Sequence, residues 1–361
     1  MLSAPSFAEG RPLSVLCELT YRCNLQCPYC YNPLALREYR DELSTDQWRA
    51  ALQQAADLGV VQAHFSGGEP TLRPDLAQIV QSASRAGLYT NLITQGTFLD
   101  DALLDALLAS CLDHIQISIQ APEAEPADRI AGATVHARKL EALQRVLRRD
   151  VALTLNCVLH RLNHAAIGDV IAFAEELGVT RLELANVQFY GWAYRNRLAL
   201  MPTRRQVETG EAIVAAARER LRGKMEIVYV RPDYFDDFPK PCMNGWGRQF
   251  MTIAPNGYVL PCPAAAAISQ LSFENVRERR LEEIWRDSDS FRRYRGTGWM
   301  PEPCRSCDRR EIDWGGCRCQ AFLLTGDAGV TDPACSLSAD HPLVVALRDA
   351  PEEGALVARR A

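Results

Sequence analysis

The chain has 361 residues, a formal net charge of −5, and 47% hydrophobic and 24% charged residues. This length and composition predict a globular protein of about two domains with a sizeable core. No run approaches about 18 consecutive apolar residues, which argues against a membrane span. The lack of a long basic run makes nucleic acid a poor candidate partner. The first residues do not resemble a secretory signal, so we expect a cytoplasmic protein.

Thirteen cysteines are the unusual feature of the composition, and most of them are clustered. Cys23, Cys27 and Cys30 lie together near the start. Seven more lie in the last third of the chain: Cys242, Cys262, Cys304, Cys307, Cys317, Cys319 and Cys335. Because the cytosol keeps thiols reduced, we expect metal binding here rather than disulfides. The others, Cys17, Cys111 and Cys157, lie in or beside apolar segments, and we interpret them as small core residues.

The first two thirds of the chain alternate between strand-like and helix-like segments. Apolar, β-rich runs predict strands at residues 14–20, 60–66, 88–94, 114–120, 151–158 and 181–187. Helical periodicity predicts helices at residues 44–58, 103–108, 137–147, 164–177 and 203–221. Six strand–helix units predict an α/β fold, an open and partial (β/α)6 barrel of the TIM type, because a closed barrel needs eight. The site of such a fold lies at the carboxyl ends of the strands.

The pattern changes from about residue 225, where helical periodicity weakens and proline, glycine, cysteine and tryptophan increase. Residues 250–254 and 258–260, separated by Asn256-Gly257, predict a hairpin, since Asn-Gly suits a tight primed turn. Residues 304–319 have little apolar periodicity, and a metal cluster would supply the stability that so small a core lacks. We therefore expect a second domain here, followed by a frayed tail.

Two motifs follow the first two predicted strands. Cys23-Asn-Leu-Gln-Cys27-Pro-Tyr-Cys30 is a C-x3-C-x2-C motif, and three thiolates can hold three irons of a four-iron cluster while the fourth iron stays open for a ligand. A three-cysteine zinc site or a set of reactive thiols is the alternative. In Ser66-Gly67-Gly68-Glu69-Pro70, the glycines allow backbone to approach a ligand and the carboxylate can accept from an ammonium. Alone, this second segment would be an ordinary turn.

The cysteine trio is the motif of the radical S-adenosylmethionine (SAM) enzymes, which this chain resembles. The resemblance implies that the trio holds a [4Fe-4S] cluster whose open iron binds SAM. The residues expected to contact SAM are Tyr29, Gly67, Gly68, Glu69, Ser118, Gln120 and Asn156. In the family, the aromatic residue contacts adenine and the Gly-Gly-Glu segment holds the amino group. The three polar residues on later strands suggest ribose or carboxylate contacts, with satisfied core hydrogen bonds as the alternative.

The C-terminal cysteines resemble the SPASM extension of peptide-modifying radical SAM enzymes. Their order is Cys242, Gly257-x4-Cys262, Cys304-x2-Cys307, Asp313, Cys317 and Cys335, with Cys319 additional to the pattern. Asp313 stands where the family has a cysteine, so it is a candidate oxygen ligand; a solvated loop carboxylate is the alternative. The resemblance divides the chain into an N-terminal extension (1–13), a radical SAM core (14–224), a SPASM domain (225–345) and a flexible tail (346–361).

Two auxiliary iron–sulfur clusters follow from this pattern. We assign Cys242, Cys262, Cys317 and Cys319 to the first, of either [2Fe-2S] or [4Fe-4S] type. We assign Cys304, Cys307, Asp313 and Cys335 to the second, a [4Fe-4S] cluster with one aspartate ligand, whose potential should differ from that of an all-cysteine cluster. Structural zinc is the alternative for these cysteines.

Further segments, at residues 190–193, 245–248, 299–307 and 311–320, resemble the PqqA peptide cyclases of pyrroloquinoline quinone (PQQ) biosynthesis. This resemblance runs from about Leu16 to Pro333. It implies that a 5′-deoxyadenosyl radical removes hydrogen from a glutamate side-chain carbon of the precursor peptide PqqA, and that this carbon then bonds to a tyrosine ring. It also implies two partners besides PqqA, the peptide chaperone PqqD and a flavodoxin-type reductant.

Three residues beyond the last predicted strand are candidates to orient the peptide. Tyr190 and Trp192 could stack on a substrate tyrosine, and Arg197 could pair with a substrate glutamate. Packing between domains is the alternative for the two aromatic residues. The rival functions are another SPASM-type peptide maturation, such as thioether formation or sulfatase maturation, and a zinc-stabilised binding module without redox chemistry.

Overall fold

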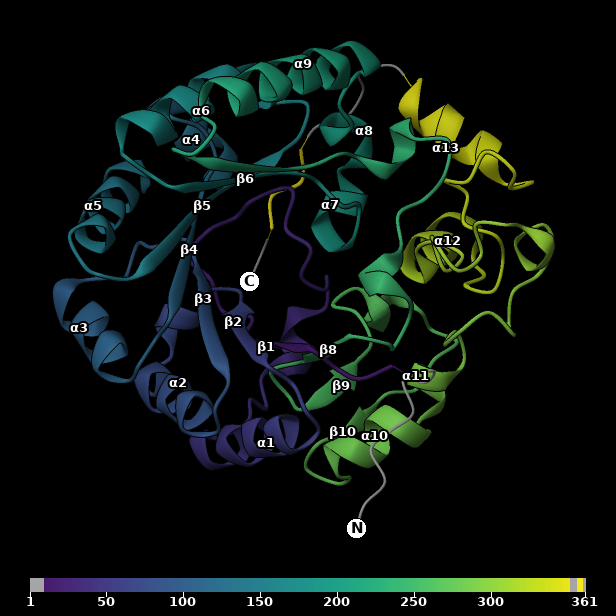
Figure 1. Cartoon of the computed structure of the whole chain (residues 1–361), viewed down its shortest axis with the longest axis horizontal. Coiled ribbons are helices and arrows are strands. Elements are labelled where there is room, and N and C mark those ends of the chain that lie inside the picture. The colour runs from purple at the N-terminus through teal and green to yellow at the C-terminus, as the bar shows by residue number, and fades with distance from the viewer. Residues whose placement is uncertain (1–9, 351–355, 360–361) are drawn as a thin grey trace.

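The structure, a computed structural model, describes residues 10–350 and 356–359. Its central feature is one sheet with the strand order β10-β9-β8-β1-β2-β3-β4-β5-β6-β7. Seven neighbouring strands run parallel: β1 (Ser14–Thr20), β2 (Gln62–Gly67), β3 (Tyr89–Thr94), β4 (His114–Ile119), β5 (Ala152–Leu159), β6 (Arg181–Asn186) and β7 (Glu226–Val230). The sheet curves into an open barrel (Figure 1), with β7 and β10 as its edges.

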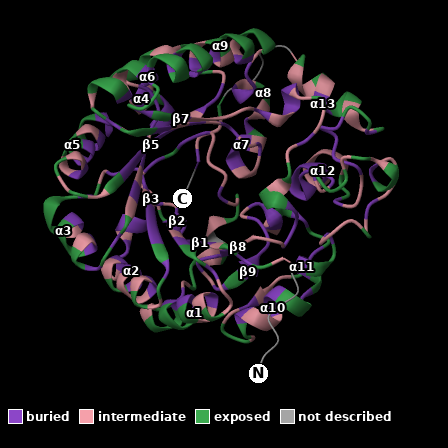
Figure 2. Ribbon diagram, in the orientation of Figure 1, coloured by how far each residue is buried: buried purple, intermediate pink, exposed green. Residues whose placement is uncertain are grey.

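Helices cover the outer face of this sheet (Figure 1). They are α1 (Thr45–Asp57), α2 (Leu76–Arg85), α3 (Asp101–Ala109), α4 (Ala124–Ala131), α5 (His136–Leu147), α6 (Ile167–Glu176) and α9 (Arg204–Arg220). In Figure 2 the outer surfaces of the helices are exposed, whereas the strands are mostly buried. Val15 and Leu19 of β1 share one buried cluster with Trp48 and Leu52 of α1. Since side chains alternate along a strand, Glu18 of β1 points to the opposite face, the barrel interior.

The predicted partial barrel is confirmed, and each of the six predicted strands agrees with the structure to within two residues. Helices α2 and α4 are not among the predicted helices, although Leu76, Ile79, Val80 and Ala83 bury one face of α2 at helical spacing. Strand β7 also adds a seventh parallel strand beside β6, from the segment where the sequence pattern changes.

The predicted hairpin is confirmed as β8 (Phe250–Ile253) and β9 (Tyr258–Leu260), and β10 (Glu274–Asn275) pairs with β9. The predicted type of turn is wrong. A type I′ turn needs a positive φ at both Asn256 and Gly257, but of these two only Gly257 has one, at +90°. The N–H of Gly257 instead donates to the carbonyl of Ala254 at 2.9 Å. Because β8 pairs in parallel with β1, the C-terminal region continues the barrel sheet.

Short helices connect the remaining segments. After β6 come α7 (Gly191–Arg195) and α8 (Arg197–Leu200), and the cysteine-rich region contains α10 (Leu281–Asp287), α11 (Asp289–Arg292), α12 (Arg318–Thr325) and α13 (His341–Arg348). No helix among the described residues is both long and apolar enough to cross a membrane.

All thirteen cysteines are free thiols. Cys17 and Cys157 are buried in the main core, as predicted. The prediction for Cys111 is wrong, because this side chain is exposed. Cys111 has a φ of +60° directly after the end of α3, a position that terminates a helix in the left-handed conformation and points away from the core.

Two parts of the segment expected to be a flexible tail, residues 346–361, make defined contacts. Helix α13 extends to Arg348, and residues 356–359 make hydrogen bonds to the loop that carries the cysteine trio. In Figure 1 the short yellow segment of residues 356–359 lies inside the ring of strands and helices. Residues 1–9 of the predicted extension, and residues 351–355 and 360–361 of the predicted tail, lie outside the described residues.

Candidate functional site

The cysteine trio lies on a loop that leaves the carboxyl end of β1. Backbone contacts fix this loop from both sides: the N–H of Gln26 donates to the carbonyl of Ala131 after α4 at 2.8 Å, and the carbonyl of Cys30 accepts from Trp192 and Ala193 at the start of α7. Within the loop, the N–H of Leu25 donates to Sγ of Cys23 at 3.4 Å. The three cysteines therefore lie on one fixed loop at the strand ends, where the fold predicts a site.

The Gly67-Gly68-Glu69 segment packs against the start of this loop. The N–H of Gly68 donates to the carbonyl of Thr20 at 2.6 Å, and the N–H of Glu69 donates to that of Arg22 at 2.8 Å. A Cβ atom on Gly67 would lie 2.2 Å from the carbonyl oxygen of Thr20, and one on Gly68 would lie 2.3 Å from that of Arg22. The glycines are therefore required by the approach of two backbone segments, which is a different reason from the ligand approach that the sequence predicts.

Glu69 is a fully buried carboxylate with a place for one more donor. Its Oε1 accepts from Thr71 and from the hydroxyl of Thr94, whereas its Oε2 accepts only from the N–H of Gln95, at 2.9 Å. Each carboxylate oxygen can accept two hydrogen bonds. Within the described residues, Oε1 of Gln95 also has no donor. Both oxygens are acceptors with room for a further donor.

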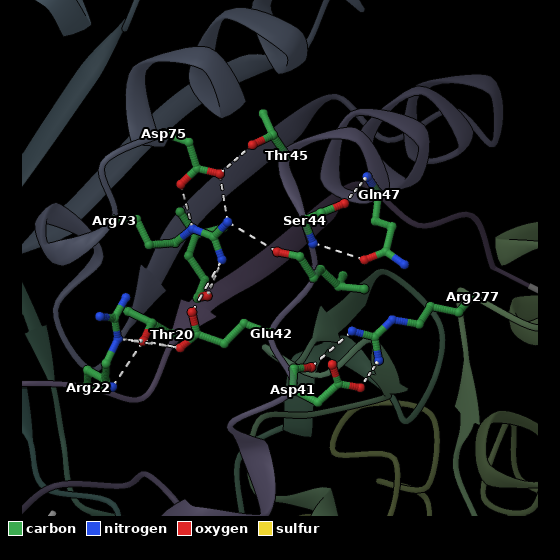
Figure 3. A network of polar contacts seen from close by, with 12 residues as sticks. Thr20, Arg22, Asp41, Glu42, Ser44, Thr45, Gln47, Arg73, Asp75 and Arg277 are labelled. Atoms are coloured by element: carbon green, nitrogen blue, oxygen red, sulfur yellow. Dashed lines mark hydrogen bonds and ion pairs between the residues drawn. The ribbon is translucent and has the colours of Figure 1, made fainter.

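A buried ion-pair network supports the ends of β1 and β2 (Figure 3). Arg73 donates through Nε and Nη2 to the two oxygens of Asp75, at 2.9 and 2.7 Å, and through Nη1 and Nη2 to the carbonyls of Leu19 and Leu43. Burial raises the pKa of Asp75, but hydrogen bonds from Arg73 and Thr45 lower it by more than burial raises it. The pKa of Asp75 therefore lies below its usual value. This network keeps both motif loops in place.

Tyr29, Gln120 and Lys139 form a buried chain next to the trio. Nε2 of Gln120 donates to the hydroxyl of Tyr29 at 2.9 Å, and Nζ of Lys139 donates to Oε1 of Gln120 at 2.8 Å and to the carbonyl of Ser118 at 3.0 Å. Lys139 is only 1% exposed, and burial lowers its pKa to about 8. Asn156 of β5 lies opposite Ser118 of β4. Lys139 is absent from the predicted site, since a lysine on an amphipathic helix normally faces solvent.

The four cysteines assigned to the first auxiliary cluster lie together in a second buried cluster. Hydrogen bonds link Cys242 to both Cys262 and Cys317, and the Sγ atoms of Cys319 and Cys262 are 3.9 Å apart. The hydrogen bonds from Cys242 and Cys319 lower the pKa of the Cys262 thiol to about 5.

The residues assigned to the second auxiliary cluster line one pocket, namely Cys304, Cys307, Asp313 and Cys335. Asp313 is 7% exposed, so it is not the solvated loop carboxylate of the alternative interpretation. Its Oδ1 accepts from the N–H of Gly315 at 3.0 Å, and its Oδ2 lies 3.4 Å from Nε of Arg309. No group of three ligand side chains in the described part of the chain has the geometry of a single-ion site.

Asp332 and Arg318 organise this region, and neither is predicted from the sequence. Asp332 is fully buried and accepts from the N–H groups of Cys317 and Ala334, so it links the two cysteine groups. Burial raises its pKa to about 7. Arg318 is also buried and donates to the carbonyls of Ala328 and Val330. Aspartate and arginine are common surface residues, so only their place in the fold reveals this role.

The three candidate peptide-orienting residues make different contacts. The hydroxyl of Tyr190 is 3.0 Å from Sγ of Cys317, which places it at the first auxiliary group. Trp192 is buried at the start of α7 against the trio loop. Arg197 lies over the ring of Tyr194, 4.4 Å from its centroid, and donates to the carbonyl of that residue.

Comparisons with known proteins agree with this arrangement. A model of the radical SAM superfamily matches residues 17–174, and a model of the SPASM iron-sulfur cluster-binding domain matches residues 242–308. The PqqA peptide cyclase of Rhodopseudomonas palustris is 55% identical over 334 residues, which cover 92% of this chain and 89% of the relative. That of Granulibacter bethesdensis is 52% identical over 331 residues, covering 91% of this chain and 88% of the relative.

Solved structures share the fold at low identity. Streptococcus suis SuiB bound to S-adenosylmethionine has a TM-score of 0.75 at 20% identity, covering 91% of this chain and 78% of SuiB. The protein anSMEcpe with bound AdoMet has a TM-score of 0.65 at 17% identity, covering 93% of this chain and 96% of that chain. Taken with the curated relatives, these matches show that the chain belongs to the PqqA peptide cyclase family of radical SAM enzymes with a SPASM domain.

Proposed function

We propose that this chain acts on the precursor peptide PqqA in PQQ biosynthesis and joins a glutamate side-chain carbon to a tyrosine ring by a C–C bond. One observation carries the proposal: a chain 55% identical to a PqqA peptide cyclase combines a cysteine trio beside Glu69 with two separate groups of four ligand-type side chains. A radical SAM enzyme that removes two hydrogens from a peptide needs both a radical source and acceptors for the electron released when the ring becomes aromatic again.

Cys23, Cys27 and Cys30 would hold the SAM-binding cluster, since their loop offers three thiols at one strand end. When bound, this [4Fe-4S] cluster and SAM supply the 5′-deoxyadenosyl radical that removes hydrogen from the peptide. The protein fixes the loop through backbone hydrogen bonds and surrounds it with buried side chains, which excludes water from a reactive intermediate.

The contacts of SAM follow from the free donors and acceptors. Glu69 Oε2 and Gln95 Oε1 would accept from the ammonium of SAM, beside Gly67 and Gly68. Nζ of Lys139 has three N–H donors, of which two bind the carbonyl of Ser118 and Oε1 of Gln120. The third N–H and the positive charge of Lys139 would bind the carboxylate of SAM.

The remaining predicted contacts lie around the same space. Gln120 fixes the hydroxyl of Tyr29, so the orientation of the ring suits a contact with adenine. Ser118 and Asn156, opposite each other on β4 and β5, would bind the ribose or the carboxylate.

The C-terminal side chains would hold two auxiliary clusters. The donor set of the first is Cys242, Cys262, Cys317 and Cys319, and either a [2Fe-2S] or a [4Fe-4S] cluster accepts such a set. The donor set of the second is Cys304, Cys307, Asp313 and Cys335, which suits a [4Fe-4S] cluster with one carboxylate ligand. When bound, such clusters supply one-electron acceptors.

Partners follow from the chemistry of a short peptide substrate. Such a peptide loses entropy when it is ordered, and a chaperone such as PqqD that presents it as an added strand reduces this cost. The radical chemistry needs a one-electron donor, for which we propose a flavodoxin-type protein. Clusters with open iron and free thiols require a reducing compartment, so we propose a cytoplasmic location.

The test is incubation of anaerobically prepared protein with PqqA, PqqD, SAM and a strong reductant. We expect a peptide that has lost two hydrogens, with fragment masses that place the new bond between a glutamate and a tyrosine. A PqqA variant with that tyrosine replaced by phenylalanine is the control. An unchanged peptide alongside active SAM cleavage would favour another peptide substrate, and a colourless, zinc-containing protein would favour a binding module.

Ligation by Asp313 has its own test. In the Asp313→Cys variant, the signal of one auxiliary cluster should shift while the other two clusters keep theirs. Asp308→Cys, a nearby carboxylate outside the predicted pattern, is the matched control and should leave all spectra as they are. An unaltered spectrum of Asp313→Cys would contradict ligation by Asp313.

A further inference from the structure

The last described residues run beside the loop that carries the cysteine trio. The N–H of Val357 donates to Oδ1 of Asn196 at 2.8 Å, and Nδ2 of the same asparagine donates back to the carbonyl of Val357 at 2.8 Å. Nδ2 also donates to the carbonyl of Pro28 inside the trio loop, at 2.8 Å. The buried amide of Asn196, between α7 and α8, therefore ties the end of the chain to the loop.

Arg359 extends this contact into the loop itself. Its backbone N–H donates to the carbonyl of Gln26 at 3.3 Å, and its guanidinium donates to the carbonyls of Tyr21 and Leu25. Arg359 is only 3% exposed. An arginine that reaches three carbonyls of one loop restricts the conformations of that loop.

The charge of Arg359 has no carboxylate partner in the part of the chain that the structure describes, and its Nε–H has no acceptor there. A buried cation is costly unless an anion lies near it. The loop that Arg359 contacts carries Cys23, Cys27 and Cys30, and a cluster held by their thiolates would supply the missing anion.

We propose that residues 356–359 form a strap over the cysteine trio, in which Arg359 is a positioning residue for the SAM-binding cluster. The inference rests on the proposed function only in that the trio holds this cluster. Asn196 anchors the strap, and the Arg359 guanidinium holds the loop carbonyls and compensates the negative charge of three thiolates. Because reduction adds a further negative charge, a buried cation at this place raises the reduction potential of the cluster and favours its retention.

The first test is the Arg359→Gln variant of the full chain, reconstituted anaerobically. We expect the midpoint potential of the SAM-binding cluster, followed by EPR, to shift to more negative values, while the auxiliary clusters keep theirs. Arg359→Lys, which retains the charge, should recover most of the shift. Arg222→Gln removes the same charge from an arginine whose side chain is 76% exposed, and it should change no potential.

A second measurement does not depend on a loaded cluster. Deletion of residues 356–361 should raise the amide hydrogen exchange of residues 21–30 severalfold and leave α1 unchanged. Unaltered exchange together with an unaltered potential in Arg359→Gln would overturn the inference. Wild-type protein whose iron content is the same as that of Cys27→Ala would overturn the proposed function, and the inference with it.

Discussion

The two cysteine-bearing regions of this molecule are built in different ways. The N-terminal trio lies on one loop at the end of a regular strand, and the barrel on which it stands is one continuous hydrophobic core. The C-terminal cysteines lie on segments spread from Cys242 to Cys335, joined by short helices and turns. There, buried charged groups such as Asp332 and Arg318 hold backbone segments that regular packing does not.

This difference shows which interactions hold each site in its conformation. Packing and backbone pairing order the barrel site. Under the proposed function, a cluster held there would keep an open iron. The C-terminal region has a smaller buried apolar cluster around its first group of cysteines, and its second group lines a pocket. We therefore expect its stability to depend more on bound clusters. The first region is suited to changing a bound ligand, and the second to holding closed clusters.

The largest expected effect comes from removing one ligand of the trio. Cys27→Ala should abolish reductive SAM cleavage, because the cluster loses one of three ligands, while the auxiliary spectra remain. The product 5′-deoxyadenosine is measured by chromatography. Cys17→Ala, which removes a core cysteine of the preceding strand, is the control and should retain cleavage. Full activity of Cys27→Ala would contradict the assignment of the trio.

Removal of iron should affect the two regions to different extents. After chelation, we expect amide exchange to rise strongly across residues 300–335 and little in β1 to β6, because only the C-terminal region relies on its ligands for order. Hydrogen-exchange mass spectrometry of the loaded and iron-free protein measures this. Equal increases in both regions would remove the distinction between them.

The ion-pair network below the trio should have a smaller effect, on stability. Arg73→Met removes the buried guanidinium, so the half-buried Asp75 keeps only Thr45 and the carbonyls of Leu19 and Leu43 lose their bonds to it. This should lower the free energy of unfolding by about 3 kcal/mol. Arg49→Met breaks the pair of Arg49 with Asp46 at the surface and should cost less than about 0.5 kcal/mol. Chemical denaturation measures both, and equal losses would contradict the importance of burial.

Glu18 should give the barrel a pH dependence. Burial raises the pKa of Glu18 to about 7 from 4.5, although Tyr21 and Tyr31 donate hydrogen bonds to it. Between these pH values the folded state binds more protons than the unfolded state, so stability falls as pH rises through this window. In Glu18→Gln, the decrease in the free energy of unfolding over this pH window should be smaller by about 2 kcal/mol.

Thermal unfolding from pH 5 to pH 8 measures this difference between wild type and variant. The exposed Glu38→Gln is the control and should follow the wild-type curve. A Glu18→Gln curve parallel to wild type would show that Glu18 does not titrate in this range.

The sequence predicts the barrel well because its strands and α1 follow simple periodicities that directly reflect burial. The C-x3-C-x2-C spacing of the trio is local and can be read directly from the sequence. The C-terminal ligand order comes from a family resemblance and stays a prediction. Lys139, Asp332 and Arg359 are not predictable in this way, because each makes contacts with residues that are distant from it in the sequence. Cys111 shows the opposite failure: it lies in an apolar context, but its left-handed backbone places it at the surface.

The most direct test of the account is reductive SAM cleavage by anaerobically prepared, iron-loaded protein. The account predicts 5′-deoxyadenosine in wild type and none in Cys23→Ala, Cys27→Ala or Cys30→Ala. Absence of 5′-deoxyadenosine from fully loaded wild-type protein under strong reduction would contradict it.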